Sequence, residues 1–415
     1  MLEEVKPRFS PAPLPPEHAR GTRDCGNEIP PVSDLPGSLA VRRHEGQEAL
    51  RALVGPLRSA GFLPASIAAM QPDYLAEGFE GNQPGAVVAY SKGRPVAYVT
   101  YAVRRTRFLL EFGPRACRGL PCRQLRLFGY ATQTDHHGLI LDQFFQSLLE
   151  DKTWHVAQIL DLPDHSPLAE YLRQLPIQPG RNWSLACKTF ETFQVKIEED
   201  FESYLRNNFN KKTRYNLKRE VRLLEAAAPG QVATRIYSSP DQVAEFLRDA
   251  RRIAQRTYQW KFGFNTLRAV PLAKVLYFAQ HGRMRSYILF IRDVPVAYCA
   301  ARIRRGALSY DDVGYDPQFA QLNPGKVLLY KILEDLHKNR AVRELEFGRG
   351  SAQYKRLFAN SSRRALDLTL YRHEPYSQLL RLLASTADAG YQCLRPLIRP
   401  WVPHIKRRFR DQASA

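Results

Sequence analysis

The chain has little that would place it outside the cell or across a membrane. Its 415 residues include six cysteines, at positions 25, 117, 122, 187, 299 and 393, and none of them forms a CxxC pair. Scattered cysteines without an apolar leader are typical of a reduced chain. No window approaches the roughly 18–20 apolar residues that a spanning helix needs. We therefore expect a cytoplasmic protein, either free or peripheral to the inner face of the membrane.

Metal ligands are also sparse. Cys117 and Cys122 lie close together, but no second cysteine pair or histidine cluster completes four ligands. The histidine pair, His136 and His137 beside Asp135, consists of adjacent residues, which point in different directions on a helix or strand. The sequence therefore predicts no metal site.

Acidic residues are outnumbered. There are 61 Lys and Arg residues against 41 Asp and Glu, which gives a formal net charge of +20 and a pI of about 9.8. Such an excess favours a polyanionic partner, such as tRNA, an acidic polysaccharide, a lipid-linked phosphate precursor or an anionic membrane leaflet. A basic composition that serves only solubility is the alternative interpretation.

The length and an internal match predict two related halves. A single core stops growing near roughly 250–300 residues, and this chain is longer. Residues 92–98 (KGRPVAY) match residues 292–298 (RDVPVAY) at a spacing of 200 residues. Each copy places turn residues before Pro-Val-Ala-Tyr and follows an apolar run. The match indicates an internal duplication.

The apolar pattern alternates between the periods of strands and helices. Three short apolar runs near the end of the second half are separated by turn-prone residues, as in an antiparallel meander, and an Asn-Pro-Gly-Lys break then precedes helical spacing. The expected elements are helices at 47–60, 139–150 and 166–175, strands within 85–138 and at 154–160 and 184–190, a basic helix at 203–225, a helix at 240–259, strands at 286–291, 295–303 and 307–315, a helix from 327, a strand at 344–347, a short helix carrying 354 and 355, and a strand at 365–371.

The order strand, strand, strand, helix, strand, helix, strand resembles the core of the GNAT acyltransferase superfamily. Segments 310–316, 323–325 and 347–355 are similar to bacterial FemAB-like proteins of the CelD type, a group linked to cellulose or exopolysaccharide biosynthesis. The basic segment 209–219 is similar to the helix that opens their catalytic half. The resemblance covers about 85–371 and is specific for the family but not for the substrate.

The resemblance implies an α/β (α+β) fold of tandem duplicated GNAT-like domains, with mixed, mostly antiparallel sheets flanked by helices. We expect a disordered, proline-rich leader at 1–40 and a GNAT-like half at 41–195 that has lost its cofactor site and forms a wall of the acceptor cleft. The acyltransferase half would occupy 196–373. A basic, amphipathic tail at 374–415 would follow, suited to an anionic membrane surface.

The resemblance also implies acetyl-CoA or another acyl-CoA as the donor, and no metal. A helix N-terminus with unpaired N–H groups is a site for the donor's pyrophosphate. We assign this site to Gln321, Asn323, Pro324, Gly325 and Lys326. One glycine stands where the family has two, so we expect fewer main-chain contacts to the phosphates.

Transfer to an amine or hydroxyl needs a base for the acceptor proton and an acid for the leaving thiolate. The resemblance gives the acid to Tyr354 and places Lys355 where it can offset negative charge. For the base the candidates are Asp312 and Asp316. Strand alternation puts Tyr310 on the same face as Asp312. We expect direct transfer, since no cysteine or serine lies in an activated setting.

The candidates for acceptor binding are basic or aromatic. They are Arg214 and Lys218 on the basic helix, Trp260 in the loop after the next helix, Tyr310 and Arg349. Arg349 and Lys355 together suit an anionic acceptor. A solvated helix face and a packed tryptophan are the ordinary alternatives.

Three functions therefore compete. The first is an acyl-CoA-dependent N- or O-acyltransferase acting on a sugar-containing or cell-envelope acceptor. The second is an aminoacyl-tRNA-dependent transferase of the Fem type, which the charge of +20 suits but the lack of a long charged heptad insertion does not. The third is a non-catalytic scaffold that binds polyanions. The sequence does not decide the acyl group or the acceptor.

Overall fold

The computed structural model describes residues 39–62, 83–112, 115–150, 153–174, 183–257, 260, 266–268, 270–304, 306–340, 342–350 and 352–398. The leader expected at 1–40 lies almost wholly outside these residues, as does the end of the tail. Within them the strands form one mixed sheet of 12, in the order β1-β2-β3-β4-β5-β12-β6-β11-β10-β9-β8-β7.

The strands and helices occur in two similar sets, one in each half of the chain. The strands are β1 (Leu39–Glu45), β2 (Gln83–Ser91), β3 (Arg94–Phe112), β4 (Arg115–Thr132), β5 (Val156–Pro163), β6 (Trp183–Lys196), β7 (Val232–Tyr237), β8 (Ser286–Ile291), β9 (Val294–Arg304), β10 (Ala307–Tyr315), β11 (Glu344–Arg349) and β12 (Ser361–Arg372). The main helices are α1 (Gln47–Ser59), α4 (His137–Glu150), α5 (Pro167–Gln174), α6 (Phe201–Asn208), α7 (Lys211–Ala227), α8 (Val243–Gln255), α10 (Leu272–Gln280), α11 (Pro324–Asn339), α12 (Gln353–Phe358) and α13 (Pro375–Ile398).

The duplication predicted from the repeat is present in detail. Lys92 and Gly93 both have positive φ, as do Arg292 and Asp293, so each repeat makes a two-residue hairpin turn of the kind that matches the strand twist. The register shifts between Ala89 and Tyr90 in one hairpin, and at the same place in the other hairpin. The predicted α/β (α+β) fold of tandem, helix-flanked halves is therefore confirmed.

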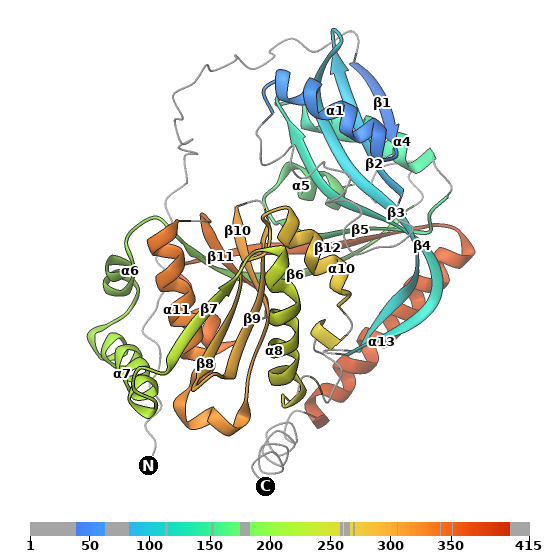
Figure 1. Ribbon diagram of the computed structural model, residues 1–415. Helices are drawn as coiled ribbons and strands as arrows, with labels where there is room; N and C mark the ends of the chain where they lie inside the picture. Colours follow the sequence, from blue (N-terminus) through green and yellow to red (C-terminus); the bar gives the residue numbers. More distant parts are fainter. Residues whose placement is uncertain are drawn as a thin grey trace.

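The last strand of each half lies beside the other half. β6 pairs antiparallel with β11 and β12, whereas β12 lies between β5 and β6. The domain boundary expected between residues 195 and 196 thus falls at the end of β6. Both neighbours of β6 in the sheet come later in the chain. This exchange joins the two half-sheets at the centre of the molecule, between the upper and lower parts of Figure 1.

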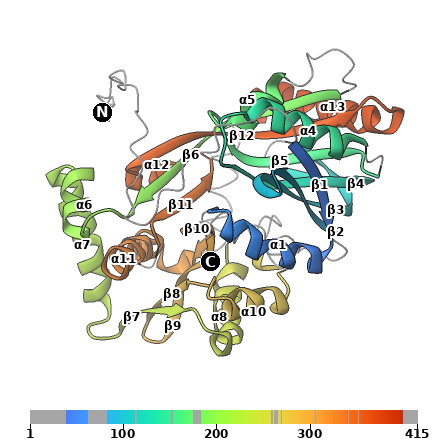
Figure 2. The same cartoon turned by 90° about the horizontal axis from the view of Figure 1, so that it is seen from above.

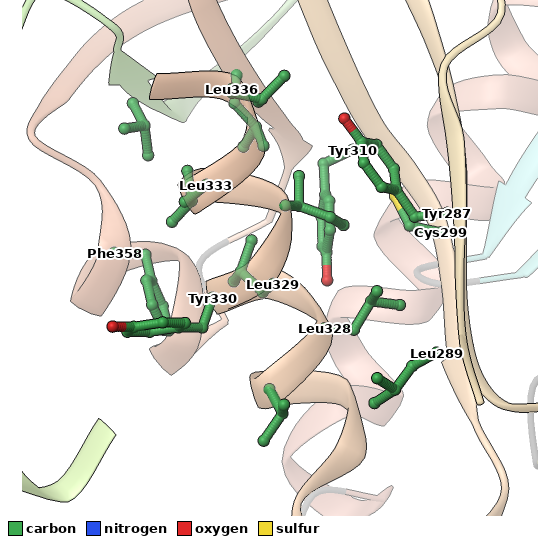
Figure 3. Close-up of a cluster of buried hydrophobic side chains, with 14 of the residues drawn as sticks. Tyr287, Leu289, Cys299, Tyr310, Leu328, Leu329, Tyr330, Leu333, Leu336 and Phe358 are labelled. Carbon is green, nitrogen blue, oxygen red and sulfur yellow. The ribbon is translucent and has the colours of Figure 1, made fainter. Parts of the chain in front are cut away.

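Helices cover both faces of the second half (Figures 1 and 2). On one face α11 packs on the sheet with α6, α7 and α12 nearby, and Leu328, Leu329, Leu333 and Leu336 form its apolar side. Figure 3 shows Leu328 directed at Leu289 of β8, with Phe358 of α12 on the other side of α11. On the other face α8 and α10 pack on Ile288 and Tyr298. The helical spacing predicted from residue 327 is therefore that of α11.

Two predicted helices differ from the structure. The basic helix expected at 203–225 is divided into α6 and α7 because the Asn210 side chain accepts a hydrogen bond from Thr213 N, at 2.8 Å, and begins a new helix. The helix expected at 240–259 consists of a single 3-10 turn, Pro240–Gln242, followed by α8, which ends at Gln255.

Candidate active site

The central feature of the second half is a divergence of two parallel strands. β10 pairs with β11 only where Ala307–Ser309 face Glu344–Glu346. Beyond this point β10 continues on β9 as far as Tyr315, while β11 continues on β6 as far as Arg349. The facing edges of diverging strands present main-chain N–H and C=O groups that an extended ligand can use. Beyond Ser309 and Glu346, β10 and β11 are therefore no longer paired with each other.

A β-bulge in β10 places two of the predicted site residues on opposite faces. Ser309 pairs with Arg302 and Asp312 pairs with Ala300, so β10 contains one extra residue. Tyr310 consequently belongs to the core under α11, whereas Asp312 accepts a hydrogen bond from Tyr298 of the α8 face, at 2.9 Å. The expectation that Tyr310 and Asp312 share a face is wrong, because simple alternation does not allow for the bulge.

An aromatic cluster lies at the divergence on the α11 face. The ring of Tyr354, on α12, makes edge contacts with Tyr310 at 6.3 Å and with Phe347 at 5.9 Å between ring centroids. Tyr310 is buried, and burial raises the pKa of its phenol well above the usual value. Tyr354 is only partly buried. Of the two phenols, Tyr354 is thus the less buried one.

Charged side chains lie close together on the opposite face of the sheet, away from α11. Glu346 is the last residue of β11 that pairs with β10, and Arg363 of β12 donates to its carboxylate at 3.3 Å. Burial raises the pKa of Glu346 above its usual value of 4.5, although Arg304 and Arg363 act to lower it. A buried carboxylate with a raised pKa is a stronger base than an exposed one. Glu346 is therefore a candidate base that the sequence analysis missed.

The signal for Glu346 was present in the strand pattern. Glu344 and Glu346 alternate with Leu345 and Phe347, so the strand has one apolar and one acidic face. In a strand with neighbours on both sides, an acidic face is unusual and indicates charged partners. Those partners come from β9 and β12, and the sequence alone does not place these strands near β11.

The charged cluster extends to the junction with the first half. Asp161 of β5 has a positive φ of 58° and its main-chain N–H donates to Asp367 Oδ1 at 3.0 Å. Arg349 forms an ion pair with Asp367, and its guanidinium lies over the ring of Phe190 at 4.7 Å. Arg363 donates to Asp161 at 3.1 Å. The strand exchange thus brings acids and arginines of both halves to the α8 face beside the divergence.

Lys355 is buried beneath the end of β11. Its ammonium donates to the carbonyl oxygens of Phe347, at 2.6 Å, and of Arg349, at 2.5 Å. These bonds hold β11 to α12 where the strand leaves β10. Its surroundings therefore suit a residue that fixes the shape of the divergence.

Asp316 is almost completely buried, with 1% of its surface exposed. It forms an ion pair with Arg256 of the α8 end and accepts a hydrogen bond from Gln318 N at 3.1 Å. The carboxylate thereby caps the 3-10 turn Pro317–Leu322 that leads to α11. Both carboxylate oxygens of this candidate base have partners in the folded chain.

The predicted phosphate site is the start of α11. Asn323 has a positive φ of 49°, Pro324 is the first helical residue, and the amides of Lys326 and Val327 both donate to Asn323 O. Gln321 is exposed beside this turn. A Cβ atom at Gly325 would lie 3.2 Å from the Tyr315 ring, so the main chain approaches that ring closely. Pro324 has no N–H, and the Lys326 and Val327 amides already have a partner, so the start of α11 offers few free amides and the phosphate site there stays a prediction.

Basic residues near α11 already have hydrogen-bond partners within the chain. Lys326 Nζ donates to Glu220 of α7 at 2.8 Å, and Lys218 Nζ donates to both oxygens of Glu202 at 2.9 Å. Arg214 donates to the carbonyl oxygen of Phe209 at 2.8 Å. Arg214 and Lys218 thus connect α6 to α7 and lie apart from the charged cluster.

Trp260 lies on the other side of the sheet. It packs partly buried against the core of α8 and α10, with the Arg268 guanidinium 5.9 Å from its ring centroid. Its neighbours at 258–259 and 261–265 fall outside the described residues. The structure therefore places Trp260 on the α8 face, which is also the face of Asp312.

The part of the chain that the structure describes offers neither a metal cluster nor a membrane-spanning helix. Among those residues, no group of three or more His, Cys, Asp or Glu side chains is placed to hold a metal ion. No helix there has the length and apolar character needed to cross a bilayer.

Comparisons with known proteins agree with this geometry. Residues 211–356 match the family model described as an acetyltransferase (GNAT) domain. A search of curated protein sequences finds no match. The crystal structure of FemX has a TM-score of 0.53 and 10% identity, covering 81% of this chain and 99% of that chain.

Two further solved structures have lower TM-scores. The C-terminal domain of a putative lysylphosphatidylglycerol synthetase from Agrobacterium fabrum has a TM-score of 0.47 and 10% identity, covering 81% of this chain and 96% of that chain. A tandem GNAT protein from the clavulanic acid biosynthesis pathway has a TM-score of 0.44 and 11% identity, covering 81% of this chain and 99% of that chain. At such identity the likeness to FemX concerns the fold alone. Residues 211–356 are thus similar to the acetyltransferase (GNAT) domain family, within a fold of two similar halves.

Proposed function

We propose that the protein transfers an acyl group from acetyl-CoA or another acyl-CoA to an amine or hydroxyl of a sugar-containing or cell-envelope acceptor. The observation that carries this proposal is the divergence of β10 and β11, which has a phenol on one face and carboxylates on the other. A thioester bound between the strands would meet an acid and a base from opposite sides. The likeness to CelD-type proteins extends the proposal to polysaccharide biosynthesis in bacteria.

The donor supplies an electrophilic carbonyl carbon and a thiolate leaving group. In the proposed reaction Glu346 or Asp312 takes the proton from the acceptor nucleophile, directly or through one water. Tyr354 gives its phenolic proton to the departing sulfur. Main-chain N–H groups of β10 at the bulge polarise the carbonyl. Asp316 remains a candidate base, although its ion pair with Arg256 favours a positioning role.

The acceptor is proposed to bind on the α8 face. Arg349 and Arg363 surround the carboxylates there, which suits an acceptor with a phosphate or carboxylate group. Trp260 lies on the same side of the sheet and would stack on a sugar ring. Lys355 would hold the end of β11 in place while the acceptor binds.

Donor binding is tested by calorimetric titration with acetyl-CoA and longer acyl-CoAs. Gly325→Glu places a negative side chain at the start of α11, against the Tyr315 ring, so we expect it to weaken acyl-CoA binding at least about tenfold, or ~1.4 kcal/mol. Gly138→Glu is the matched control, because Gly138 is also the second residue of its helix, α4, and a Cβ there meets no atom within 4 Å.

These calorimetric titrations have three possible outcomes. Saturable acyl-CoA binding that Gly325→Glu loses and Gly138→Glu keeps supports the donor site at α11. Equal loss in both variants contradicts its location. No binding of any acyl-CoA to the unaltered protein contradicts the donor itself and leaves the polyanion scaffold as the better hypothesis.

One surface favours a second candidate, an aminoacyl-tRNA-dependent transferase of the Fem type. The outer side of α7 carries exposed Lys212, Arg219 and Arg222, and Tyr215 there is 60% exposed. Cations interleaved with an aromatic ring suit a nucleic-acid backbone and its bases. Titration with aminoacylated tRNA in rising salt discriminates the candidates, since tRNA binding through this face would weaken steeply with salt.

The base is tested by the pH dependence of kcat/KM. If Glu346 is the base, activity falls as the pH drops through its pKa, which burial holds above 4.5. Glu346→Gln keeps the shape and removes the titration, so we expect kcat/KM to fall roughly 100- to 10,000-fold and the acidic limb to disappear. Glu344→Gln, on the same strand, is the control. An unchanged acidic limb in Glu346→Gln would assign the base to Asp312 or Asp316.

A further inference from the structure

A cavity in the first half shares no residue with the candidate active site. It has a volume of about 560 Å³ and lies where β3 and β4 pass the turn before β5 and the first turn of α13. Figure 1 shows the long β3–β4 hairpin beside α13. The lining residues are Arg105, Thr106, Pro121, Cys122, Arg123, Thr153, His155 and Tyr376.

Two arginines on neighbouring strands line this cavity. Arg105 of β3 is the direct cross-strand partner of Arg123 of β4, and both line the space. Like charges in directly opposite positions destabilise a pair of strands. Arg123 donates to Thr153 O at 3.3 Å, and neither arginine has an ion pair with a described carboxylate side chain. An anion between the two guanidinium groups would turn this repulsion into attraction.

His155 adds a neutral hydrogen-bond donor. Its Nδ1 accepts a hydrogen bond from the Arg123 main-chain N–H at 3.1 Å, which leaves the hydrogen on Nε2. Burial lowers the pKa of His155, and Arg123 and Arg372 act in the same direction while Glu374 opposes them. The ring packs edge-on against Tyr376 with a centroid distance of 4.9 Å. The imidazole is therefore held in place as a donor near the arginines.

We propose that this cavity binds a phosphoryl group. Guanidinium groups match the planar pairs of oxygens on phosphate, and the polar residues Thr106 and Thr153 line the same space. The phosphoryl group belongs either to a free phosphate ester or to the headgroup of an anionic phospholipid. Leu379 and Leu382, which are exposed on the same helix as the lining residue Tyr376, suit the second source.

The test uses inorganic pyrophosphate and lipid vesicles as probes for the full chain. Binding is measured by calorimetry with pyrophosphate and by co-sedimentation with vesicles of phosphatidylcholine and phosphatidylglycerol in equal amounts. Arg105→Gln and Arg123→Gln are each expected to weaken binding at least about tenfold. Arg58→Gln, which removes an exposed charge on α1, controls for net charge. Gly325→Glu, which alters the start of α11, is expected to remove only the pyrophosphate binding that belongs to the proposed donor site there.

A second measurement separates binding from folding. Without ligand, Arg105→Gln should melt at the same temperature as the unaltered protein or higher, because it removes a like-charge pair. Pyrophosphate binding that both arginine variants lose identifies a free phosphate ester, whereas loss confined to vesicle binding identifies a lipid headgroup. Equal binding in all variants, or no binding of either probe, overturns the proposal.

Discussion

Tyr354→Phe should lower kcat of acyl transfer roughly 100- to 10,000-fold, the range expected when a general acid is removed. Phenylalanine keeps the ring that contacts Tyr310 at 6.3 Å and Phe347 at 5.9 Å, so the cluster at the divergence remains packed. The loss would fall on kcat because the leaving thiolate is protonated only as the acyl group departs. Steady-state kinetics with saturating acyl-CoA and a melting curve for each variant provide the measurement.

Tyr310→Phe is the matched control for this experiment. It removes a phenol from the same cluster, but burial raises the pKa of Tyr310 far above its usual value, so this phenol is a poor proton donor. We expect its kcat to change less than about fivefold, since the ring remains. Comparable losses in both variants would mean that the cluster acts by packing. A Tyr354→Phe enzyme with nearly full kcat would assign the acid to another group.

Asp316→Ala should lower the free energy of unfolding by about 3 kcal/mol, at the lower end of the cost of breaking a buried ion pair. Asp316 is 1% exposed, whereas its partner Arg256 reaches partly into solvent and regains hydration when the pair is broken. The alanine also leaves Gln318 N without its hydrogen bond, and so weakens the turn before α11. Denaturant unfolding of the variant and the unaltered protein measures the difference.

A partly exposed ion pair, Lys218 with Glu202, supplies the comparison for this stability measurement. Glu202→Gln removes the carboxylate that Lys218 contacts at 2.9 Å, and we expect a loss below about 1 kcal/mol because both side chains are partly exposed. The double variant Asp316→Ala with Arg256→Ala should be less destabilised than the sum of the two single variants. If Asp316→Ala keeps its stability and loses kcat, Asp316 is a catalytic base and not the support of the turn.

The strands and helices of the second half were largely predictable because their signals are local. The runs at 286–291 and 307–315 match β8 and β10 in both bounds, since turn residues such as Arg292-Asp293 and Gly306 separate the strands by local chemistry alone. The expected 344–347 and 365–371 lie within β11 and β12. The start of a new helix at Asn210 was missed, because the same polar residue types occur at a helix cap and at a solvent-facing position within a helix.

The candidate site was predictable only in part. Tyr354, Asp312 and Gly325 were found from their place in a familiar order of elements, and their roles stay proposals. Glu346 was missed because its importance depends on Arg304 and Arg363, which belong to other strands. The ion pair of Asp316 with Arg256 was missed for the same reason, as the partners lie 60 residues apart.

The sequence by itself determined the class of fold, the duplication and the succession of elements, because turn residues, apolar periods and the PVAY repeat act over a few residues. Tertiary structure alone decided which strands are neighbours. It exchanged β6 and β12 between the halves, inserted the bulge that separates Tyr310 from Asp312, and set Arg105 opposite Arg123. These arrangements depend on the pairing of edges far apart in the chain, and local patterns do not encode which edges meet.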